Sequence, residues 1–484
     1  MDNKPSTLVY IASFGALLGA LSMGLALGYS SPAFVSMDKE ENDNNRVLDP
    51  DTKTSDNQKS LIGSMLAIGA LVGGFLSEPS NKMLGRRLSL VFFGLPFIIG
   101  WVLIASARGV TLIVLGRIVT GLCCGLVSGT APTYVVEIAT PDIRGLLGTC
   151  FQVMVVIGIL LEAVFGTFLG WKALAAASLV PSIAMSIIMF FMPETPQWLL
   201  SKGRREEAEQ SLSRLRSTPV SGELTTMAQQ AENARQSGTR YSLQLFRNPE
   251  FYKPFVLALG LMFFQQFSGI NAVLFYQTEI FKAVSENSDA LLSSIYVCIA
   301  QVIATIIGSV LVDRLGRKML LAASGLGHVL SLVVLGIYFC IKNSYTDNSP
   351  EQKDFQSGYG WLALASLIVF ISSFSLGFGP IPWMMIPELS STRVRSIVAS
   401  IATAFNWLCV YIVTATVGPL ISYIGFNWTY WLFAIICLVS CIFVIFALPE
   451  TKGKSSEQIQ TEMLGLTPVT RQSDKREEPM KSLA

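Results

Sequence analysis

Histidine, charge and paired cysteine motifs are scarce in this 484-residue sequence. It contains one histidine, and charged residues make up 14% of it, whereas soluble chains carry about 25%. The net charge of +2 is too small to indicate binding to nucleic acid. The eight cysteines lie in or beside apolar segments, without the paired spacing of a metal or disulfide framework. We therefore expect no cofactor, no bound metal, no nucleic-acid partner and no enzyme activity.

Apolar sequence, in contrast, is abundant. Hydrophobic residues make up 51% of the chain and the mean hydropathy is +0.52, which is typical of an integral membrane protein. Runs of about 20 apolar residues, each long enough to cross a bilayer as a helix, recur along the chain. They lie at about 8–28, 60–78, 88–107, 111–133, 146–168, 171–192, 254–282, 290–312, 319–341, 361–386, 396–420 and 427–447. The sequence predicts an all-α membrane protein with twelve transmembrane helices, surrounded by lipid.

Polar segments divide these helices into two sets of six. Residues 193–253 are hydrophilic, and Ala208, Leu212 and Leu215 have the spacing of a short amphipathic helix. We expect an N-terminal six-helix half over 1–192, a helical linker over 193–253, a C-terminal six-helix half over 254–448 and a tail over 449–484. Lys and Arg are concentrated in the segments that would share one side with both termini and the linker, which predicts that this side is cytoplasmic. Nothing in the sequence specifies an oligomeric state.

Polar amides occur where a membrane-spanning segment should be apolar. Gln265, Gln266 and Asn271 lie in one apolar run. One straight helix could not point all three side chains at one place, because successive residues turn by about 100°. Ser268-Gly269 lies between them, so we expect the helix to break there, as in the substrate sites of secondary transporters. Amides pair with hydroxyl groups both as donors and as acceptors, which predicts a neutral, hydroxyl-rich ligand; the alternative is that they only join helices.

Charged motifs repeat between the two sets of helices, in the same order and at the same predicted membrane edge. The repeated groups are Arg86 and Arg87 with Arg314 and Arg317, Glu137 and Arg144 with Glu388 and Arg395, and Glu194 with Glu450. Two six-helix halves that repeat each other are the plan of the major facilitator superfamily of transporters.

Several segments together carry a more specific resemblance. They are Gly116-Arg117, Arg144-Gly145, Pro193-Glu194-Thr195-Pro196, Gln265-Gln266-Phe267-Ser268-Gly269-Ile270-Asn271, Gly379-Pro380-Ile381-Pro382-Trp383 and Pro449-Glu450-Thr451-Lys452-Gly453-Lys454. Along nearly its whole length the chain resembles the facilitative glucose transporter, or sugar porter, family, and most of all its facilitated trehalose transporter-type members. The resemblance implies alternating-access transport of a glucose-type hexose or trehalose. The N-terminal tail has no acidic dileucine signal, which favours the plasma membrane over an endomembrane.

The resemblance also implies a set of sugar-binding residues. Positions that match those of the family are Gln152, Gln265, Gln266, Asn271, Trp383 and Asn406. Gln301 stands where many members have Asn, a change that keeps the amide but lengthens its reach. Trp383 would offer an apolar face to sugar C–H groups, and its alternative role is in an interfacial aromatic belt.

The repeated charges are assigned by the same resemblance to a gate. In the family such groups bridge the two halves when the cytoplasmic side is shut. The corresponding residues here are Arg86, Arg87, Glu137, Arg144, Glu194, Arg314, Arg317, Glu388, Arg395 and Glu450. The alternative is that the arginines only anchor the cytoplasmic side and the acids are solvated.

Two further charged residues lie deeper in the spans. Arg117 is in the fourth span and Glu162 in the fifth, at a similar depth, so we predict a buried ion pair between them. Proton-coupled relatives carry an Asp after the Gly-Tyr pair of the first span, and here Gly28-Tyr29 is followed by Ser30. We therefore expect uniport. The alternatives are a sugar/proton symporter that uses Glu162 and a non-transporting sugar sensor of the same fold.

Overall fold

The computed structural model describes residues 5–42, 56–217, 219–236, 249–284, 290–346, 349–390, 394–454 and 456–464. Within these ranges the chain is helical, apart from turns and one isolated bridge between Pro5 and Arg216. The N-terminal half consists of α1 (Thr7–Gly28), α2 (Ser30–Asn42), α3 (Asp56–Leu84), α4 (Arg86–Ala105), α5 (Val110–Ile138), α6 (Pro141–Phe165), α7 (Trp171–Ala177) and α8 (Leu179–Phe191). The linker holds α9 (Pro196–Ser201), α10 (Arg205–Leu215) and α11 (Ser221–Gln236). The C-terminal half consists of α12 (Pro249–Phe267), α13 (Ile270–Val284), α14 (Ala290–Leu315), α15 (Arg317–Lys342), α16 (Pro350–Leu376), α17 (Ile381–Leu389) and α18 (Arg395–Ala447), and α19 (Ser456–Leu464) follows.

The long helices form a membrane-spanning bundle. Within the described ranges, eleven helical segments are long and apolar enough to cross a membrane. The last of them, in α18, contains Gly425 in a non-helical conformation (φ 83°, ψ 168°), so α18 is two spans joined at a kink. The predicted fold of twelve transmembrane helices in two halves is therefore confirmed. Large apolar side chains such as Phe75, Leu95 and Phe446 are exposed on the outside of the bundle, as lipid contact requires.

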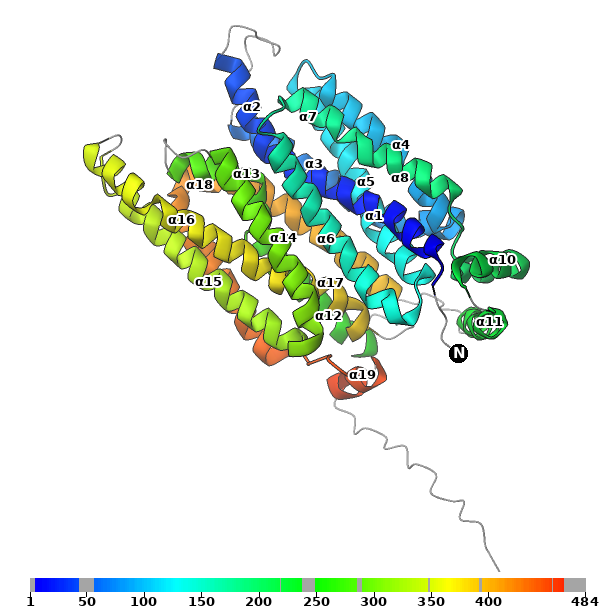
Figure 1. Ribbon diagram of the computed structural model, residues 1–484. Helices are drawn as coiled ribbons and strands as arrows, with labels where there is room; N and C mark the ends of the chain where they lie inside the picture. Colours follow the sequence, from blue (N-terminus) through cyan, green and yellow to red (C-terminus); the bar gives the residue numbers. More distant parts are fainter. Residues whose placement is uncertain are drawn as a thin grey trace, which may run out of the picture.

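The two ends of the bundle differ. In Figure 1, α10, α11 and α19 lie at one end, termed here the linker side, and α2 and α7 lie at the other, termed the far side. The linker is fastened to the N-terminal half, where Arg216 Nη1 donates a hydrogen bond to the carbonyl oxygen of Ile138 (2.9 Å). α19 packs on α12 and α17, and Lys253 Nζ donates to the carbonyl oxygen of Met463 at its end (2.7 Å). Each half therefore carries its own helices on the linker side.

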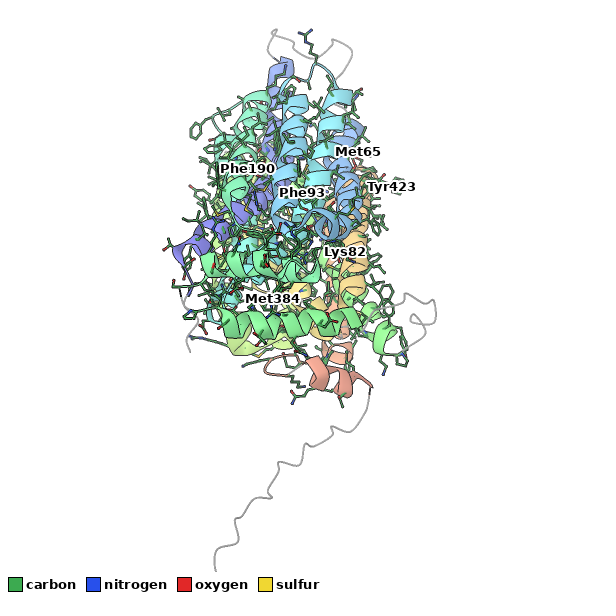
Figure 2. The ribbon with its side chains drawn as sticks, turned by 90° about the vertical axis from the view of Figure 1, so that its right-hand side faces the viewer. Met65, Lys82, Phe93, Phe190, Met384 and Tyr423 are labelled. Carbon is green, nitrogen blue, oxygen red and sulfur yellow. The ribbon has the colours of Figure 1, made fainter. Side chains whose placement is uncertain are left out.

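The predicted amphipathic helix of the linker is confirmed. α10 begins at Arg205, and Ala208, Leu212 and Leu215 are fully buried. In Figure 2 the linker helices cross beneath the lower ends of the spans, close to the labelled Lys82.

The first span is longer than the sequence predicts. The predicted span ends near Gly28, but the helical path continues through Tyr29 into α2. Ala33 and Phe34 are fully buried, and α2 packs against α13 and α7. The acidic residues after Met37 make this segment look solvated in the sequence, whereas its first turns belong to the contact between the halves.

The two halves meet mainly where α3 packs on α18, α6 on α14 and α2 on α13. On the far side, Ser60 Oγ in α3 lies 3.2 Å from the carbonyl oxygen of Ala415 and 3.4 Å from that of Thr414. Polar contacts therefore hold the halves together on the far side.

The repeated motifs build the same helix start in both halves. Gly85 and Gly316 precede α4 and α15 with φ of 91° and 93°, a conformation that favours glycine. A Cβ at Gly85 would lie 2.4 Å from Glu194 Oε2, and one at Gly316 would lie 2.9 Å from Glu450 Oε2. Glycine at these positions lets each carboxylate approach the first backbone N–H groups of the following helix.

We expect Gly85→Ala to destabilise the protein by about 1–3 kcal/mol, because alanine is strained at this φ and its Cβ would crowd Glu194. Gly145→Ala is the matched control, since Gly145 lies inside α6 with open space where a Cβ would be. That control should be neutral or stabilising by up to about 1 kcal/mol. Thermal unfolding of the purified variants in detergent measures both effects, and an equal loss in the two would contradict the argument.

Candidate ligand-binding site

The predicted break in the seventh span is present. α12 ends at Phe267 and α13 begins at Ile270, so the break lies at Ser268-Gly269 as the sequence predicts. Gly269 adopts φ 90°, and a Cβ there would lie 3.0 Å from the ring of Phe433. The backbone can turn here because the residue is glycine.

A second break lies in the tenth span. α16 ends at Leu376 and α17 begins at Ile381, and four turn residues separate them. Trp383 therefore lies just after a break within its span. A break in a transmembrane helix leaves backbone carbonyl groups without helical partners, which is costly in a low-dielectric environment.

Gln265 joins the two breaks. Its Nε2 donates hydrogen bonds to the carbonyl oxygens of Phe378 (2.7 Å) and Gly379 (2.9 Å), which lie between α16 and α17. The side chain of Gln265 is buried. One amide at the end of α12 thus satisfies two carbonyl groups that the other break leaves free.

Four amides form a connected hydrogen-bond network around this contact. Asn406 Nδ2 donates to Gln265 Oε1 (2.7 Å), and Gln266 Nε2 donates to Asn406 Oδ1 (3.2 Å). Asn271 Nδ2 donates to Gln266 Oε1. All four residues are buried, so the break at Gly269 brings together side chains that one straight helix would separate.

The amide network lines a pocket of ≈ 90 Å³ between the two halves. All seven residues predicted to bind sugar contribute to its lining: Gln152, Gln265, Gln266, Asn271, Gln301, Trp383 and Asn406. No charged residue belongs to this lining. Gln152 is the polar contribution of the N-terminal half, whose other lining residues are Met23, Leu27, Val155 and Ile159.

Two polar atoms of the lining residues are buried without a hydrogen-bond partner, Gln301 Oε1 and Trp407 Nε1. They offer a ligand one acceptor and one donor. Sequence reasoning did not select Trp407. The signal available was its place directly after Asn406, in a span where an indole N–H has few partners other than a ligand.

The repeated charges pair within each half. Arg86 Nη2 lies 2.8 Å from Glu137 Oε1 in the N-terminal half. Arg317 Nη2 lies 3.3 Å from Glu388 Oε1 in the C-terminal half. Neither pair crosses between the halves. The bridging role is therefore a prediction for a conformation in which the linker side is shut.

The other predicted gate arginines have different surroundings. Arg87 Nη2 donates to the carbonyl oxygen of Phe190 (2.7 Å), and Arg144 Nη2 donates to that of Ala139 (3.4 Å). Arg314 is exposed. The side chain of Arg395 lies outside the described residues.

Glu194 and Glu450 occupy related positions, but their pKa values are shifted in opposite directions. Burial raises the pKa of Glu194 above its ordinary value, although backbone N–H groups at the start of α4 donate to its carboxylate. Burial alone would also raise the pKa of Glu450, but hydrogen bonds to its carboxylate outweigh this effect. Hydrogen bonds from the backbone N–H groups of Lys452, Arg317 and Lys318 hold the pKa of Glu450 below its ordinary value.

These opposite shifts predict opposite pH slopes of stability. A lowered folded-state pKa means that Glu450 stabilises the fold above its unfolded pKa and loses that contribution as the pH falls. The stability difference between wild type and Glu450→Gln should therefore shrink on acidification. A raised pKa reverses the sign, so the difference between wild type and Glu194→Gln should shrink as the pH rises. Thermal unfolding from acidic to neutral pH tests both, and parallel slopes would overturn the assignment.

The predicted ion pair between Arg117 and Glu162 is wrong. Both residues are fully buried, but Arg117 is bound by other groups. Its Nη1 donates to the carbonyl oxygen of Ala26 (2.6 Å), its Nη2 to Ser30 Oγ (2.9 Å) and its Nε to the carbonyl oxygen of Ile62 (3.3 Å). The guanidinium group thus fastens α5 to the end of α1 and to α3.

Glu162 lies at the same level but faces a different partner. Ser178 Oγ, between α7 and α8, lies 3.2 Å from Glu162 Oε2 and 3.0 Å from the carbonyl oxygen of Leu174. A Cβ at Gly28 would meet the Cβ of Glu162 at 3.1 Å, so this acid packs on the same part of α1 that binds Arg117. Both residues therefore pack near the end of α1, where Ala26 and Ser30 accept the hydrogen bonds of Arg117 that the ion pair would have used.

Comparison with known proteins identifies the relatives of this chain. Residues 7–463 match the family described as "Sugar (and other) transporter". The facilitated trehalose transporter Tret1 of Anopheles gambiae is 39% identical over 457 residues, which cover 94% of this chain and 56% of that protein. The facilitated glucose transporter member 8 of solute carrier family 2 from Mus musculus is 38% identical over 466 residues, covering 94% of each chain.

A solved structure agrees with these relatives. The structure of the proton:xylose symporter XylE bound to 6-bromo-6-deoxy-D-glucose is 26% identical, with a TM-score of 0.76, and covers 94% of this chain and 99% of that chain. The fold is that of the major facilitator superfamily. Within that superfamily the chain belongs to the sugar transporter family. It spans little more than half the length of the Anopheles relative.

Proposed function

We propose that this chain is a facilitative sugar transporter, which moves a glucose-type hexose or trehalose across a membrane by alternating access. One observation carries the proposal: amides from the broken seventh span and from α6, α14 and α18, with Trp383 beside the break in the tenth span, line a single uncharged pocket between two halves of a transporter fold. A carboxylate or phosphate substrate would call for Arg or Lys in the lining, and a cation for Asp or Glu. The relatives named as trehalose and glucose transporters support a sugar as the neutral, hydroxyl-rich substrate.

The amide network explains how the pocket could bind and release such a substrate. Each amide already has protein partners, so a sugar hydroxyl exchanges one hydrogen bond for another of similar strength. Such exchange gives modest affinity and low barriers to release. Trp383 and Trp407 add apolar ring faces, against which the C–H groups of a sugar can pack.

We expect Gln301→Ala and Asn271→Ala each to raise the half-saturation concentration for sugar uptake. A lost hydrogen bond to a neutral hydroxyl costs about 0.5–1.5 kcal/mol, roughly two- to tenfold in affinity. Gln301 is the cleaner test, since its Oε1 has no protein partner whose loss could disturb the fold. The control is Gln197→Ala, which removes an exposed amide of the linker.

The measurement is uptake of labelled glucose and of labelled trehalose into liposomes that contain the purified protein. Unchanged half-saturation in both pocket variants would place the site elsewhere. Sugar binding without flux in the wild type would identify a non-transporting sensor and refute transport.

A second candidate function is proton-coupled transport, and the surroundings of Glu162 favour it. The ion pair that would keep this acid charged is absent. The hydroxyl of Ser178 can donate one hydrogen bond, either to the carbonyl oxygen of Leu174 or to the carboxyl group of Glu162. When the hydroxyl donates to Leu174, a hydrogen bond between Ser178 and Glu162 requires the carboxyl group of Glu162 to be protonated and to act as the donor. Buried acids in transmembrane segments are frequent proton carriers.

Uniport predicts that flux into liposomes is the same with and without an inward proton gradient, because Ser30 in the first span cannot titrate. Labelled sugar should equilibrate but not accumulate, and a protonophore should not change its final level. Accumulation that requires the gradient, and that is lost in Glu162→Gln, would establish symport instead. Arg117 stays unchanged in this variant, so the hydrogen bonds that fasten α5 to α1 remain intact.

The proposal includes a placement in the cell. We place the protein in the plasma membrane, and the distribution of Lys and Arg supports a cytoplasmic position for both termini and the linker side.

A further inference from the structure

A second pocket lies on the linker side, away from the amide network. It has a volume of ≈ 250 Å³ and lies between the ends of α3 and α4 and the linker helix α10. Arg204, Glu207, Ser211 and Arg214 line it from the linker, at intervals of three or four residues that place them on one face of the helix. The adjoining face of α10, with Ala208, Leu212 and Leu215, is buried. Figure 2 shows α10 crossing beneath the bundle in this region, near Lys82.

The pocket has more positive charge than its own acids neutralise. Arg204 is fully paired, because its Nε and Nη2 both donate to the carboxylate of Glu207 (2.6 and 2.5 Å). The carboxylate of Glu194 is occupied by backbone N–H groups at the start of α4. Arg87 and Arg214 also line the pocket, and neither has a carboxylate partner among the described side chains. Two guanidinium groups are therefore available to an anion.

Arg87 is held in place for such a contact. Its Nη2 donates to the carbonyl oxygen of Phe190 (2.7 Å), while its Nε is buried without a hydrogen-bond partner. An orphaned buried donor on a cation is costly, and a bound anion would satisfy it. Arg214 is exposed at the other wall, where its side chain can turn toward the same ligand.

The walls above the arginines are apolar. Leu84 and Leu88 line the pocket itself. Met83, Phe190 and Phe191 lie close in sequence to its lining residues and are 76%, 57% and 66% exposed, as expected for groups that contact lipid. The arginines therefore lie where the spans end and the polar headgroups of that leaflet begin.

We propose that this pocket binds the headgroup phosphate of an anionic phospholipid in the leaflet on the linker side. Arg87 and Arg214 would contact the phosphate oxygens, and the acyl chains would lie along the apolar surface around Phe190. Guanidinium groups suit this ligand because their planar fork of donors matches two phosphate oxygens. The lipid would tie α10 to the end of α4, next to the predicted gate residue Arg86.

The test uses native mass spectrometry of the full chain in detergent, titrated with phosphatidic acid or with phosphatidylcholine of the same acyl chains. We expect wild type to prefer phosphatidic acid by about tenfold or more, and Arg214→Gln to lose most of that preference. Arg214 is exposed and has no ion pair, so its replacement spares the fold. The double variant Arg87→Gln/Arg214→Gln should show no preference.

Arg205→Gln is the matched control, since Arg205 is an exposed arginine of the same helix that does not line the pocket. It should keep the wild-type preference. An equal loss in Arg205→Gln and Arg214→Gln would show diffuse attraction to the linker and overturn the site, as would equal binding of the two lipids by wild type. Glycerol 3-phosphate should compete far more weakly than phosphatidic acid; equal competition would assign the pocket to a soluble phosphate and overturn the lipid.

Discussion

The rest of the ligand site depends on the hydrogen bonds between the Gln265 amide and the carbonyl oxygens of Phe378 and Gly379. A membrane interior offers no water to backbone groups, so a broken helix survives only where other groups satisfy its free carbonyls. Gln265 does this for the tenth span from the end of α12. The same contact fixes its Oε1, which accepts from Asn406 and starts the amide network. A stabilising contact of the fold thus also orients the site.

The repeat shows a similar double use of polar groups at the linker side. A glycine at positive φ leaves the first backbone N–H groups of α4 and of α15 accessible. These groups donate hydrogen bonds to a glutamate from the end of each half. The two copies share geometry but differ in burial, and the pKa shifts of Glu194 and Glu450 are opposite as a result. The same backbone geometry in the two halves therefore does not give the two glutamates the same pKa shift.

The sequence predicts the fold and the amides Gln265, Gln266 and Asn271 of the pocket from local patterns, whereas Gln152, Gln301, Trp383 and Asn406 follow from the family resemblance. Apolar run length fixes the spans, and the glycine between Gln266 and Asn271 fixes the break. What it misses depends on rotation about helix axes and on packing. Arg117 and Glu162 both pack near the end of α1, yet Arg117 bonds to α1 and Glu162 to Ser178. Arg86 and Arg317 pair within their own halves here, because sequence spacing does not choose between two nearby carboxylates, and the bridging role of the gate residues stays a prediction.

The pocket is lined unequally by the two halves, and this has a kinetic consequence. Its polar groups come from the C-terminal half, except for Gln152. A sugar would therefore keep nearly all its hydrogen bonds while the N-terminal half moves away from it. The relative position of the two halves would then determine from which side of the membrane water reaches the sugar. It would have little effect on how tightly the sugar is bound. Affinity measured from either face of the membrane would be similar.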